Sequence, residues 1–278
     1  MKPFGQIYTC RLLLLFLLTS VSVTFGEILH LKIPSAALSD SNRVIVATPT
    51  NYDENTKNTY PFIIMLHGWS GDETQWEDDS ELQVLSDKYN VLLVLPDGGY
   101  DGWWVDTDLT PGRNYDTHIR QELKIWIINN FNGCGDPAHQ GILGLSMGGY
   151  GSIMQALKYP GEYAAASSLS GIMDISRHPE NWHMYAAFGP YTEDAVTWKL
   201  NNPIELLSLK KAKKTPPLQL ICGRDDFAFP ENQDMATKLN QLGYTVDFRE
   251  EAGTHSHTFW KTHVETAVAF LVSNFSGL

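Results

Sequence analysis

The sequence predicts an α/β fold, a single domain in which helices cover both faces of a mostly parallel central sheet. Two observations support this prediction. Short apolar segments, typical of buried parallel strands, recur along the chain. Between them lie segments whose apolar residues are spaced as on one face of a helix. We find no internal repeat, low-complexity tract or linker in the sequence, so one domain is the simplest interpretation.

The expected elements follow one another in a regular order. Residues 43–49 predict a half-buried strand, and a polar turn follows it. The other expected strands are 62–66, 91–95, 141–143, 164–169, 218–221 and, more exposed than the others, 245–249. The expected helices are 81–89, 115–131, 147–158, 231–242 and 258–275. Residues 171–216 are the least regular stretch, interrupted by prolines, and are a candidate for a small cap over the sheet edge.

The N-terminal segment predicts a signal peptide over residues 1–26. Lys2 and Arg11 precede an apolar run, and Gly26 supplies a small residue at the cleavage point. A membrane anchor is the alternative, but the apolar core is shorter than the roughly 20 residues that a spanning helix needs. We therefore expect a secreted or periplasmic protein, residues 27–278, without stable membrane insertion after cleavage.

The charge balance argues against two classes of partner. The formal net charge is -12 at pH 7. A protein that binds nucleic acid would carry a basic face, and one that binds anionic membranes a basic patch. The sequence shows neither, so we expect no nucleic-acid partner.

Cleavage of the leader leaves two cysteines, Cys134 and Cys222. Cys134 precedes the start of one predicted strand, and Cys222 lies near the end of another. In a parallel sheet these positions are at opposite edges, too far apart for a disulfide, whose Cα atoms lie within about 7 Å of each other. We expect two buried thiols.

The most informative motif is GLSMGG at residues 144–149. A short apolar segment precedes it, and the residues after it have the apolar spacing of a helix. A strand, a sharp turn and a helix are the setting of a nucleophile elbow, where small residues let the backbone turn tightly and expose a serine oxygen. Ser146 is therefore the predicted nucleophile of an acyl-transfer reaction.

An acid and a base follow two later strands. A serine hydroxyl needs a base, normally a histidine held by a carboxylate, and in this class of fold the chain order is serine, acid, histidine. The strand at 218–221 is followed by Asp225 and Asp226, and the last strand by His255. These positions lie at the edge where Ser146 is presented. The sequence predicts that Asp226 orients His255 and that His255 activates Ser146.

Other residues compete for these positions. Asp225 and Asp226 are adjacent, and either can be a solvated loop acid. His257 lies two residues after His255 and can pack beside the site, whereas His263 falls within the last helix, where we expect it on the surface. The two histidines can also be interpreted as metal ligands, but further ligands at zinc-like spacing are not apparent. We therefore predict no metal and no cofactor.

Two backbone amides are candidates to stabilise an oxyanion. The N–H of Met147 directly follows the serine. The loop after the strand at 62–66 begins HGWSG, and its glycines let the backbone approach closely, which makes the N–H of Trp69 the second candidate. We expect His67 to hold this loop rather than to carry a proton.

Aromatic residues follow the strand at 91–95. Tyr100, Trp103 and Trp104 lie in a loop at the carboxyl edge of the sheet, where ligands bind in open α/β sheets. They form a platform for a sugar or an aromatic acyl group, or they pack under the cap. The sequence does not distinguish these two alternatives.

Seven short motifs together carry a family resemblance. They are LHGWSG at 66–71, PDGG at 96–99, Tyr115 with EL at 122–123, GLSMGG at 144–149, LSG at 169–171, CGRDD at 222–226, and GTH at 253–255 with Trp260. They resemble the esterase D and antigen 85-like branch of the α/β-hydrolases. This branch includes bacterial tributyrin esterases, feruloyl esterase modules, S-formylglutathione hydrolases and secreted mycolyltransferases. The resemblance extends over nearly all of the chain after the leader.

The resemblance implies an α/β-hydrolase fold and assigns the site by position. The nucleophile, base, acid and two oxyanion donors of the branch fall on Ser146, His255, Asp226, Trp69 and Met147. The assignment thus separates Asp226 from Asp225. Many relatives carry an aromatic residue two positions after the base, where this chain has His257, and this departure bears on the acyl pocket.

The expected activity follows from this set of residues. Export argues against an S-formylglutathione hydrolase, whose substrate is cytosolic. We expect a secreted serine carboxylesterase that hydrolyses short-chain or carbohydrate-linked esters, acetyl or feruloyl, through an acyl-enzyme. The alternatives are an acyltransferase of the mycolyltransferase type and a non-catalytic carbohydrate-binding protein on the same fold. The presence of all three catalytic candidates argues against the second alternative.

Overall fold

The computed structural model describes residues 26–79, 81–209 and 212–277. The predicted signal peptide therefore lies outside the described residues, apart from Gly26. Within these three ranges, no helix has both the length and the apolar character that crossing a membrane would need.

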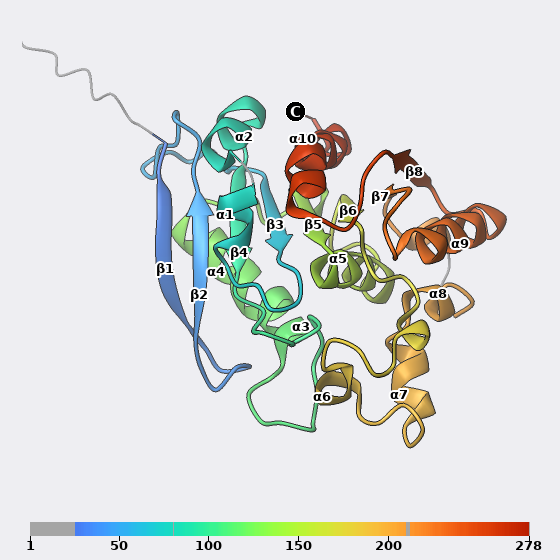
Figure 1. The fold of residues 1–278 in the computed structure, drawn as a ribbon. Helices are drawn as coiled ribbons and strands as arrows, with labels where there is room; N and C mark the ends of the chain where they lie inside the picture. The colour runs from blue at the N-terminus through green and yellow to red at the C-terminus, as the bar shows by residue number, and fades with distance from the viewer. Residues whose placement is uncertain (1–25, 80, 210–211, 278) are drawn as a thin grey trace, which may run out of the picture.

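A single eight-stranded sheet forms the centre of the molecule. Its strands are β1 (Ile28–Ser35), β2 (Asp40–Ala47), β3 (Phe62–Leu66), β4 (Leu92–Pro96), β5 (Gln140–Leu145), β6 (Ala165–Leu169), β7 (Leu218–Gly223) and β8 (Val246–Glu251). They lie in the order β1-β2-β4-β3-β5-β6-β7-β8 (Figure 1). β2 pairs antiparallel with both β1 and β4, and the remaining neighbours are parallel. The predicted α/β fold with a mostly parallel sheet is confirmed.

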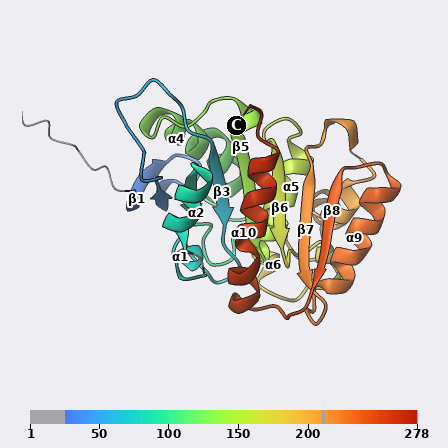
Figure 2. The ribbon, with the colours of Figure 1, turned by 90° about the horizontal axis from the view of Figure 1, so that it is seen from above.

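Helices cover both faces of the sheet (Figure 2). They are α1 (Gln75–Asp79), α2 (Leu82–Tyr89), α3 (Tyr115–Thr117), α4 (Lys124–Asn130), α5 (Met147–Lys158), α6 (Met184–Phe188), α7 (Ala195–Leu200), α8 (Pro203–Leu206), α9 (Phe229–Gln241) and α10 (His257–Ser273). One core cluster joins the sheet to α1, α2 and α10, and the other joins it to α4, α5 and α9.

The continuous apolar runs of the sequence lie where both faces are covered. Every residue of β3 and β4 is buried. Successive side chains of a strand point to opposite faces. Phe62 and Ile64 accordingly belong to one cluster, and Ile63 and Met65 to the other. A strand buried on both faces has no position for a polar side chain, which explains the unbroken apolar pattern.

Two elements of the first quarter of the chain differ from the expectation. β1 was not predicted, although Leu29, Leu31 and Ile33 alternate with exposed residues as in a half-buried strand; it forms one outer edge of the sheet, beside β2. β2 was predicted to be half-buried, yet Val44, Ile45, Val46 and Ala47 are all buried. The neighbouring strands β1 and β4 shield β2 along its length, and α2 packs against it.

The helix expected over 115–131 is interrupted by a π-helical segment, His118–Leu123, between α3 and α4. Glu122, in this segment, accepts hydrogen bonds from the amides of Ala36 and Ala37 and from the hydroxyl of Ser35. Burial by itself would raise the pKa of Glu122, but these hydrogen bonds and His118 lower it below its ordinary value. The carboxylate thus anchors the β1–β2 hairpin to the helix.

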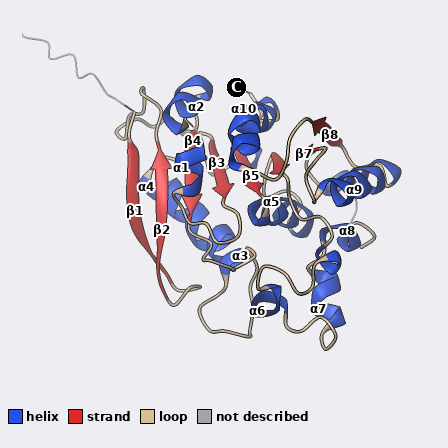
Figure 3. Cartoon of the chain, in the orientation of Figure 1, coloured by secondary structure: helices blue, strands red, loops and turns tan. Residues whose placement is uncertain are grey.

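The irregular stretch forms a cap segment (residues 171–209 and 212–216) of short helices, α6 to α8, joined by loops (Figure 3). The hydroxyl of Tyr150 on α5 donates to the carbonyl of Asn201, and the indole N–H of Trp103 donates to the carbonyl of Trp182. The cap segment therefore packs on α5 and on the loop that follows β4.

The two cysteines lie at different depths. Both are free thiols, and Cys222 at the end of β7 is buried. Cys134 is only partly buried because it lies in the loop before β5. The prediction of two buried thiols is thus right for Cys222 and wrong for Cys134.

Candidate active site

Ser146 lies in a sharp turn between β5 and α5. Its backbone has φ 52° and ψ −115°, a conformation in which a non-glycine residue is strained. The neighbouring glycines leave room for this turn. A Cβ on Gly144 would lie 2.2 Å from the carbonyl carbon of Gly148, and a Cβ on Gly148 would lie 2.1 Å from the carbonyl oxygen of Leu66. The structure therefore has the geometry of the predicted nucleophile elbow.

His255 lies in the loop between β8 and α10 and points at the serine. Its Nε2 is 2.9 Å from Oγ of Ser146. The imidazole is held between two rings, with the centroid of Phe227 at 4.4 Å and that of Trp260 at 5.1 Å. The packing fixes the plane of the imidazole, so that one ring nitrogen faces the serine and the other faces an acid.

That acid is Asp226, which follows the end of β7. Nδ1 of His255 lies 3.0 Å from each carboxylate oxygen of Asp226. The Asp226 side chain is fully buried, and its Oδ1 also accepts the amide of Ala228 at 2.9 Å. Since Nδ1 then carries the proton, Nε2 is left to accept a proton from Ser146.

The structure distinguishes the two adjacent aspartates. The Asp225 side chain is exposed, whereas its amide donates to the carbonyl of Gly253 at 3.0 Å. A Cβ on Gly223 would lie 2.3 Å from the same carbonyl oxygen. The loops after β7 and β8 are therefore fastened to each other through their backbones, which brings Asp226 to His255.

The two predicted oxyanion donors lie at the first residue of α5 and in the loop after β3. Met147 is the first residue of α5, so its N–H has no carbonyl one turn earlier in the helix to bond. The loop after β3 approaches the serine closely: a Cβ on Gly68 would lie 3.4 Å from Cβ of Ser146. Trp69 follows directly in this loop, and its amide remains the proposed second donor.

His67 holds this loop, as its fixed position in the core shows. The buried ring donates from Nδ1 to the carbonyl of Gly68 at 2.8 Å and accepts the amide of Gly98 at Nε2, 2.7 Å away. Gln75 accepts the amide of Gly68 at 2.7 Å. Because both ring nitrogens are engaged by the backbone, His67 joins the loops after β3 and β4.

Trp103 and Trp104 are packed in the core, and each is 1% exposed. Trp103 lies against Tyr150 and Phe188, with centroids 5.3 and 5.9 Å away. The indole N–H of Trp104 donates to the carbonyl of His67. The second of the two alternatives, packing beneath the cap, therefore describes these tryptophans, and a platform open to a substrate does not.

Tyr100 and the two histidines of α10 have different surroundings. Tyr100 is 53% exposed and packs against the ring of Trp69, with centroids 5.0 Å apart. The ring of His257 lies 5.1 Å from that of Trp260. His263, expected on the surface, is partly buried against Phe259, and burial lowers its pKa.

The sequence analysis missed two aromatic residues that lie beside the base. Phe227 contacts the ring of His255, and Trp182 stacks on Phe227 with centroids 5.4 Å apart and planes at 29°. The only sequence signal for Phe227 is its place directly after Asp226. Trp182 lies in the irregular cap segment, where no pattern marks it.

The described part of the chain contains no cluster of three or more His, Cys, Asp or Glu side chains arranged to hold a metal ion. The residues that the structure brings together are a hydroxyl, an imidazole, a carboxylate and nearby backbone amides. Such an arrangement can deprotonate a serine and stabilise the negative charge that forms when the serine attacks a carbonyl.

The sequence model of a family described as "Putative esterase" matches residues 35–271. An acetyl esterase of Caldicellulosiruptor saccharolyticus is 29% identical over 231 residues, which cover 78% of this chain and 84% of that protein. An S-formylglutathione hydrolase (FrmB) of Staphylococcus aureus has a similar structure, with TM-score 0.78, 21% identity and coverage of 89% of this chain and 99% of that chain.

A ferulic acid esterase also has a similar structure, with TM-score 0.78 and 20% identity, covering 90% of this chain and 99% of that chain. At these identities the likeness of the structures shows the fold. The family match includes all seven motifs from which the resemblance was drawn. The α/β-hydrolase fold and the resemblance to this branch are therefore confirmed.

Proposed function

Because the chain belongs to the esterase family, as a serine hydrolase that acts on carboxylic ester bonds, we propose that it is a secreted carboxylesterase with Ser146 as its nucleophile. The single observation that carries this assignment is a continuous series of contacts. Oγ of Ser146 lies 2.9 Å from Nε2 of His255, whose Nδ1 lies 3.0 Å from both oxygens of Asp226. The three residues follow the ends of parallel strands at one edge of the sheet.

The first half-reaction acylates the serine. Nε2 of His255 takes the hydroxyl proton as Oγ of Ser146 attacks the ester carbonyl, and the amides of Met147 and Trp69 stabilise the oxyanion. The tetrahedral intermediate collapses when His255 gives the proton to the leaving alcohol. Asp226 keeps the imidazole in the correct tautomer and stabilises its protonated form.

The second half-reaction releases the acid. His255 takes a proton from water, which attacks the acyl-enzyme at the same carbonyl carbon. The second tetrahedral intermediate then expels Ser146, which regains its proton from His255. This chemistry uses the chain's own residues, and we propose no cofactor.

We propose short-chain or carbohydrate-linked esters, acetyl or feruloyl, as the substrates. Two of the proteins compared above are named for acetyl and ferulic acid esters. The exposed ring of Tyr100 beside Trp69 offers an aromatic surface near the loop that carries the proposed oxyanion donor. Secretion rests on the leader at residues 1–26 and is tested by the N-terminal mass of the exported protein, which should begin at Glu27.

The experiment that tests the function is turnover of residues 27–278 on a panel of esters. The panel contains p-nitrophenyl acetate, butyrate and octanoate, methyl ferulate and acetylated xylan. Ser146→Ala should lower kcat by about 10⁴-fold or more, with a small residual from binding and the oxyanion donors. Ser273→Ala, which changes an exposed serine at the end of α10, is the matched control and should retain wild-type kcat.

Retained turnover in Ser146→Ala would contradict the mechanism. The acyltransferase alternative is tested in the same assay by adding an acceptor alcohol, such as a free sugar. A hydrolase releases mainly the carboxylic acid, whereas an acyltransferase would release mainly the acylated acceptor and would react slowly without it.

A further inference from the structure

Two stacked rings form an aromatic wall (Phe227 and Trp182) beside the proposed base. The Phe227 ring lies 4.4 Å from the imidazole of His255 and is inclined to it by 38°. Trp182 stacks on Phe227, and Phe227 is 48% exposed. Phe227 follows β7 and Trp182 belongs to the cap segment, so the wall is assembled from two elements far apart in the sequence.

The reaction itself indicates which part of a substrate would meet this wall. To protonate the leaving alcohol, Nε2 of His255 must come within hydrogen-bonding reach of the alcohol oxygen. The group attached to that oxygen then lies next to the imidazole, on which Phe227 is packed. The wall therefore borders the alcohol part of the ester rather than the carbonyl oxygen, which faces Met147 and Trp69.

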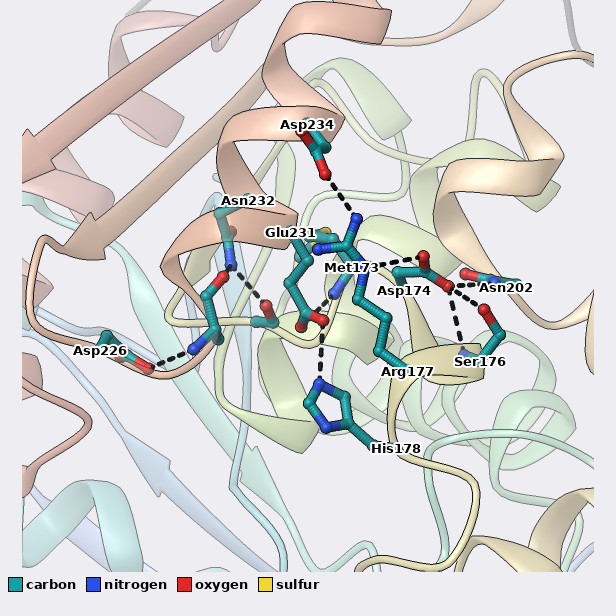
Figure 4. Close-up of polar contacts among 12 residues, drawn as sticks. Met173, Asp174, Ser176, Arg177, His178, Asn202, Asp226, Glu231, Asn232 and Asp234 are labelled. Atoms are coloured by element: carbon teal, nitrogen blue, oxygen red, sulfur yellow. Dashed lines mark hydrogen bonds and ion pairs between the residues drawn. The ribbon is translucent and has the colours of Figure 1, made fainter.

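A hydrogen bond between His178 and the buried carboxylate of Glu231 fixes the position of the wall. His178 packs against both rings, with centroids 5.0 Å from Trp182 and 6.0 Å from Phe227. Its Nε2 lies 3.0 Å from Oε2 of Glu231 on α9. The other carboxylate oxygen of Glu231 accepts the amide of Met173 at 3.1 Å, so one carboxylate ties two points of the cap segment to α9 (Figure 4).

The placement of this carboxylate is costly for the fold. Glu231 is 1% exposed, and burial raises its pKa although His178 and the Met173 amide oppose that rise. Burying a carboxylate costs free energy, which its hydrogen bonds offset only in part. The hydrogen bond from His178 to Glu231 instead determines how the His178 ring is oriented. Because Trp182 packs against that ring, the bond also determines the position of Trp182.

We propose that His178, held by Glu231, is a positioning residue that fixes the aromatic wall, and that this wall selects esters of ring-bearing alcohols. A ring with an apolar face, either the C–H face of a sugar or a planar aryl group, fits a wall of two stacked aromatic side chains. This inference rests on the proposed function, since it assigns the alcohol side of the same site.

The test compares three acetates that differ only in the alcohol: ethyl acetate, benzyl acetate and a monoacetylated methyl xylopyranoside. kcat and KM are measured for wild type, His178→Ala and His178→Gln. The matched control is Arg177→Ala. Arg177 joins the cap segment to α9 through Asp234, but it does not bond Glu231 (Figure 4).

His178→Ala should raise KM for the ring-bearing acetates by about tenfold, with a smaller change in kcat and a much smaller loss on ethyl acetate. His178→Gln can still donate to Glu231 and should recover most of the lost affinity. Arg177→Ala should show the wild-type ratio of ring-bearing to ethyl ester turnover. A preference for benzyl acetate identifies an aryl alcohol, and a preference for the xyloside identifies a sugar.

Equal losses by His178→Ala on all three acetates would overturn the inference, as would no loss on any of them. Should His178→Ala fail to fold, Phe227→Ala removes the exposed ring directly, and unchanged preference in that variant would also overturn the inference. Failure of the proposed function has a different signature: wild type would then hydrolyse no acetate, or Ser146→Ala would hydrolyse all three as well as wild type does.

Discussion

The sheet edge that carries the proposed triad and the cap segment beside it are fixed in different ways. At the edge, Ser146, Asp226 and His255 follow the ends of three parallel strands, and Gly148 lets the backbone of α5 come close to that of β3. In the cap segment, the hydrogen bond between His178 and Glu231 and the stacked rings hold short helices and loops in place. The comparison shows that the course of the backbone determines where the three proposed catalytic residues lie, whereas side-chain packing determines the shape of the surface beside them.

After the nucleophile itself, the largest effect should come from the acid at the sheet edge. Asp226→Asn should lower kcat by about 10³- to 10⁴-fold, because an amide neither stabilises the protonated imidazole nor enforces the correct tautomer. Asp225→Asn, at the neighbouring exposed position, should keep kcat within about twofold. The measurement is the initial rate on p-nitrophenyl acetate. Similar losses in both variants would show that the two aspartates share the role.

The backbone at the elbow should be the next most sensitive feature. Gly148→Ala would place a Cβ 2.1 Å from the carbonyl oxygen of Leu66, so the strand and the helix must separate. The free energy of unfolding should fall by about 3 kcal/mol, as for strongly overpacked sites. Gly135→Ala is the control, since no heavy atom lies within 4 Å of its Cβ position. Urea denaturation measures both, and equal stability of the two variants would contradict the argument.

A smaller, pH-dependent effect should come from Asp97, in the loop after β4. Burial alone would raise the pKa of its carboxyl, but the hydrogen bonds from the Gly99 amide and from Arg43 lower it below the ordinary 3.8. A lowered pKa stabilises the fold above the ordinary value, and this contribution is lost as the pH falls below about 4. The stability difference between wild type and Asp97→Asn should therefore shrink by about 1 kcal/mol between pH 6 and pH 2.

That prediction is checked by urea denaturation of both proteins at each pH. A difference that stays constant across the range would show that Asp97 titrates with its ordinary pKa in the folded protein.

The smallest effect should come from the surface of the cap segment. Arg177→Ala removes ion pairs with Asp174 and Asp234, in which the arginine and Asp234 are largely exposed. Exposed pairs contribute little, so the free energy of unfolding should change by less than about 1 kcal/mol. Thermal denaturation measures the change, and a larger loss would mean that these exposed ion pairs also hold the cap segment in place.

The sequence predicted best those strands and helices whose residue pattern fits a single environment, such as a strand buried on both faces. β3 and β4 are apolar at every position because both faces of the sheet are covered, and their place was evident from the sequence. α5 was predicted with its exact bounds, because Ser146 marks the turn before it. Chain order, strengthened by the family resemblance, placed Asp226 and His255 at the same edge.

The features that the sequence did not reveal depend on contacts between distant segments. A tryptophan that faces a substrate and one that packs in a core cannot be told apart from the sequence, so the burial of Trp103 and Trp104 was not predicted. Trp103 packs against Phe188 of α6, and α6 lies in a segment without a clear apolar pattern. The wall of Phe227 and Trp182 requires His178 and Glu231 to meet across the cap segment and α9. Short-range periodicity carries no information about such meetings.

The backbone hydrogen bond between Asp225 and Gly253 has a consequence for the timing of turnover. β8 is one of the two edge strands of the sheet and is paired on one side only, so it is freer to fluctuate than the strands in the middle. Because the loop after β8 is hydrogen-bonded to the loop after β7, we expect Asp226 and His255 to move together when this edge of the sheet fluctuates. The separation that varies is then the one between His255 and Ser146. The hydrogen bond between Nδ1 of His255 and Asp226 would then be kept even when Nε2 is too far from Oγ of Ser146 to accept its proton.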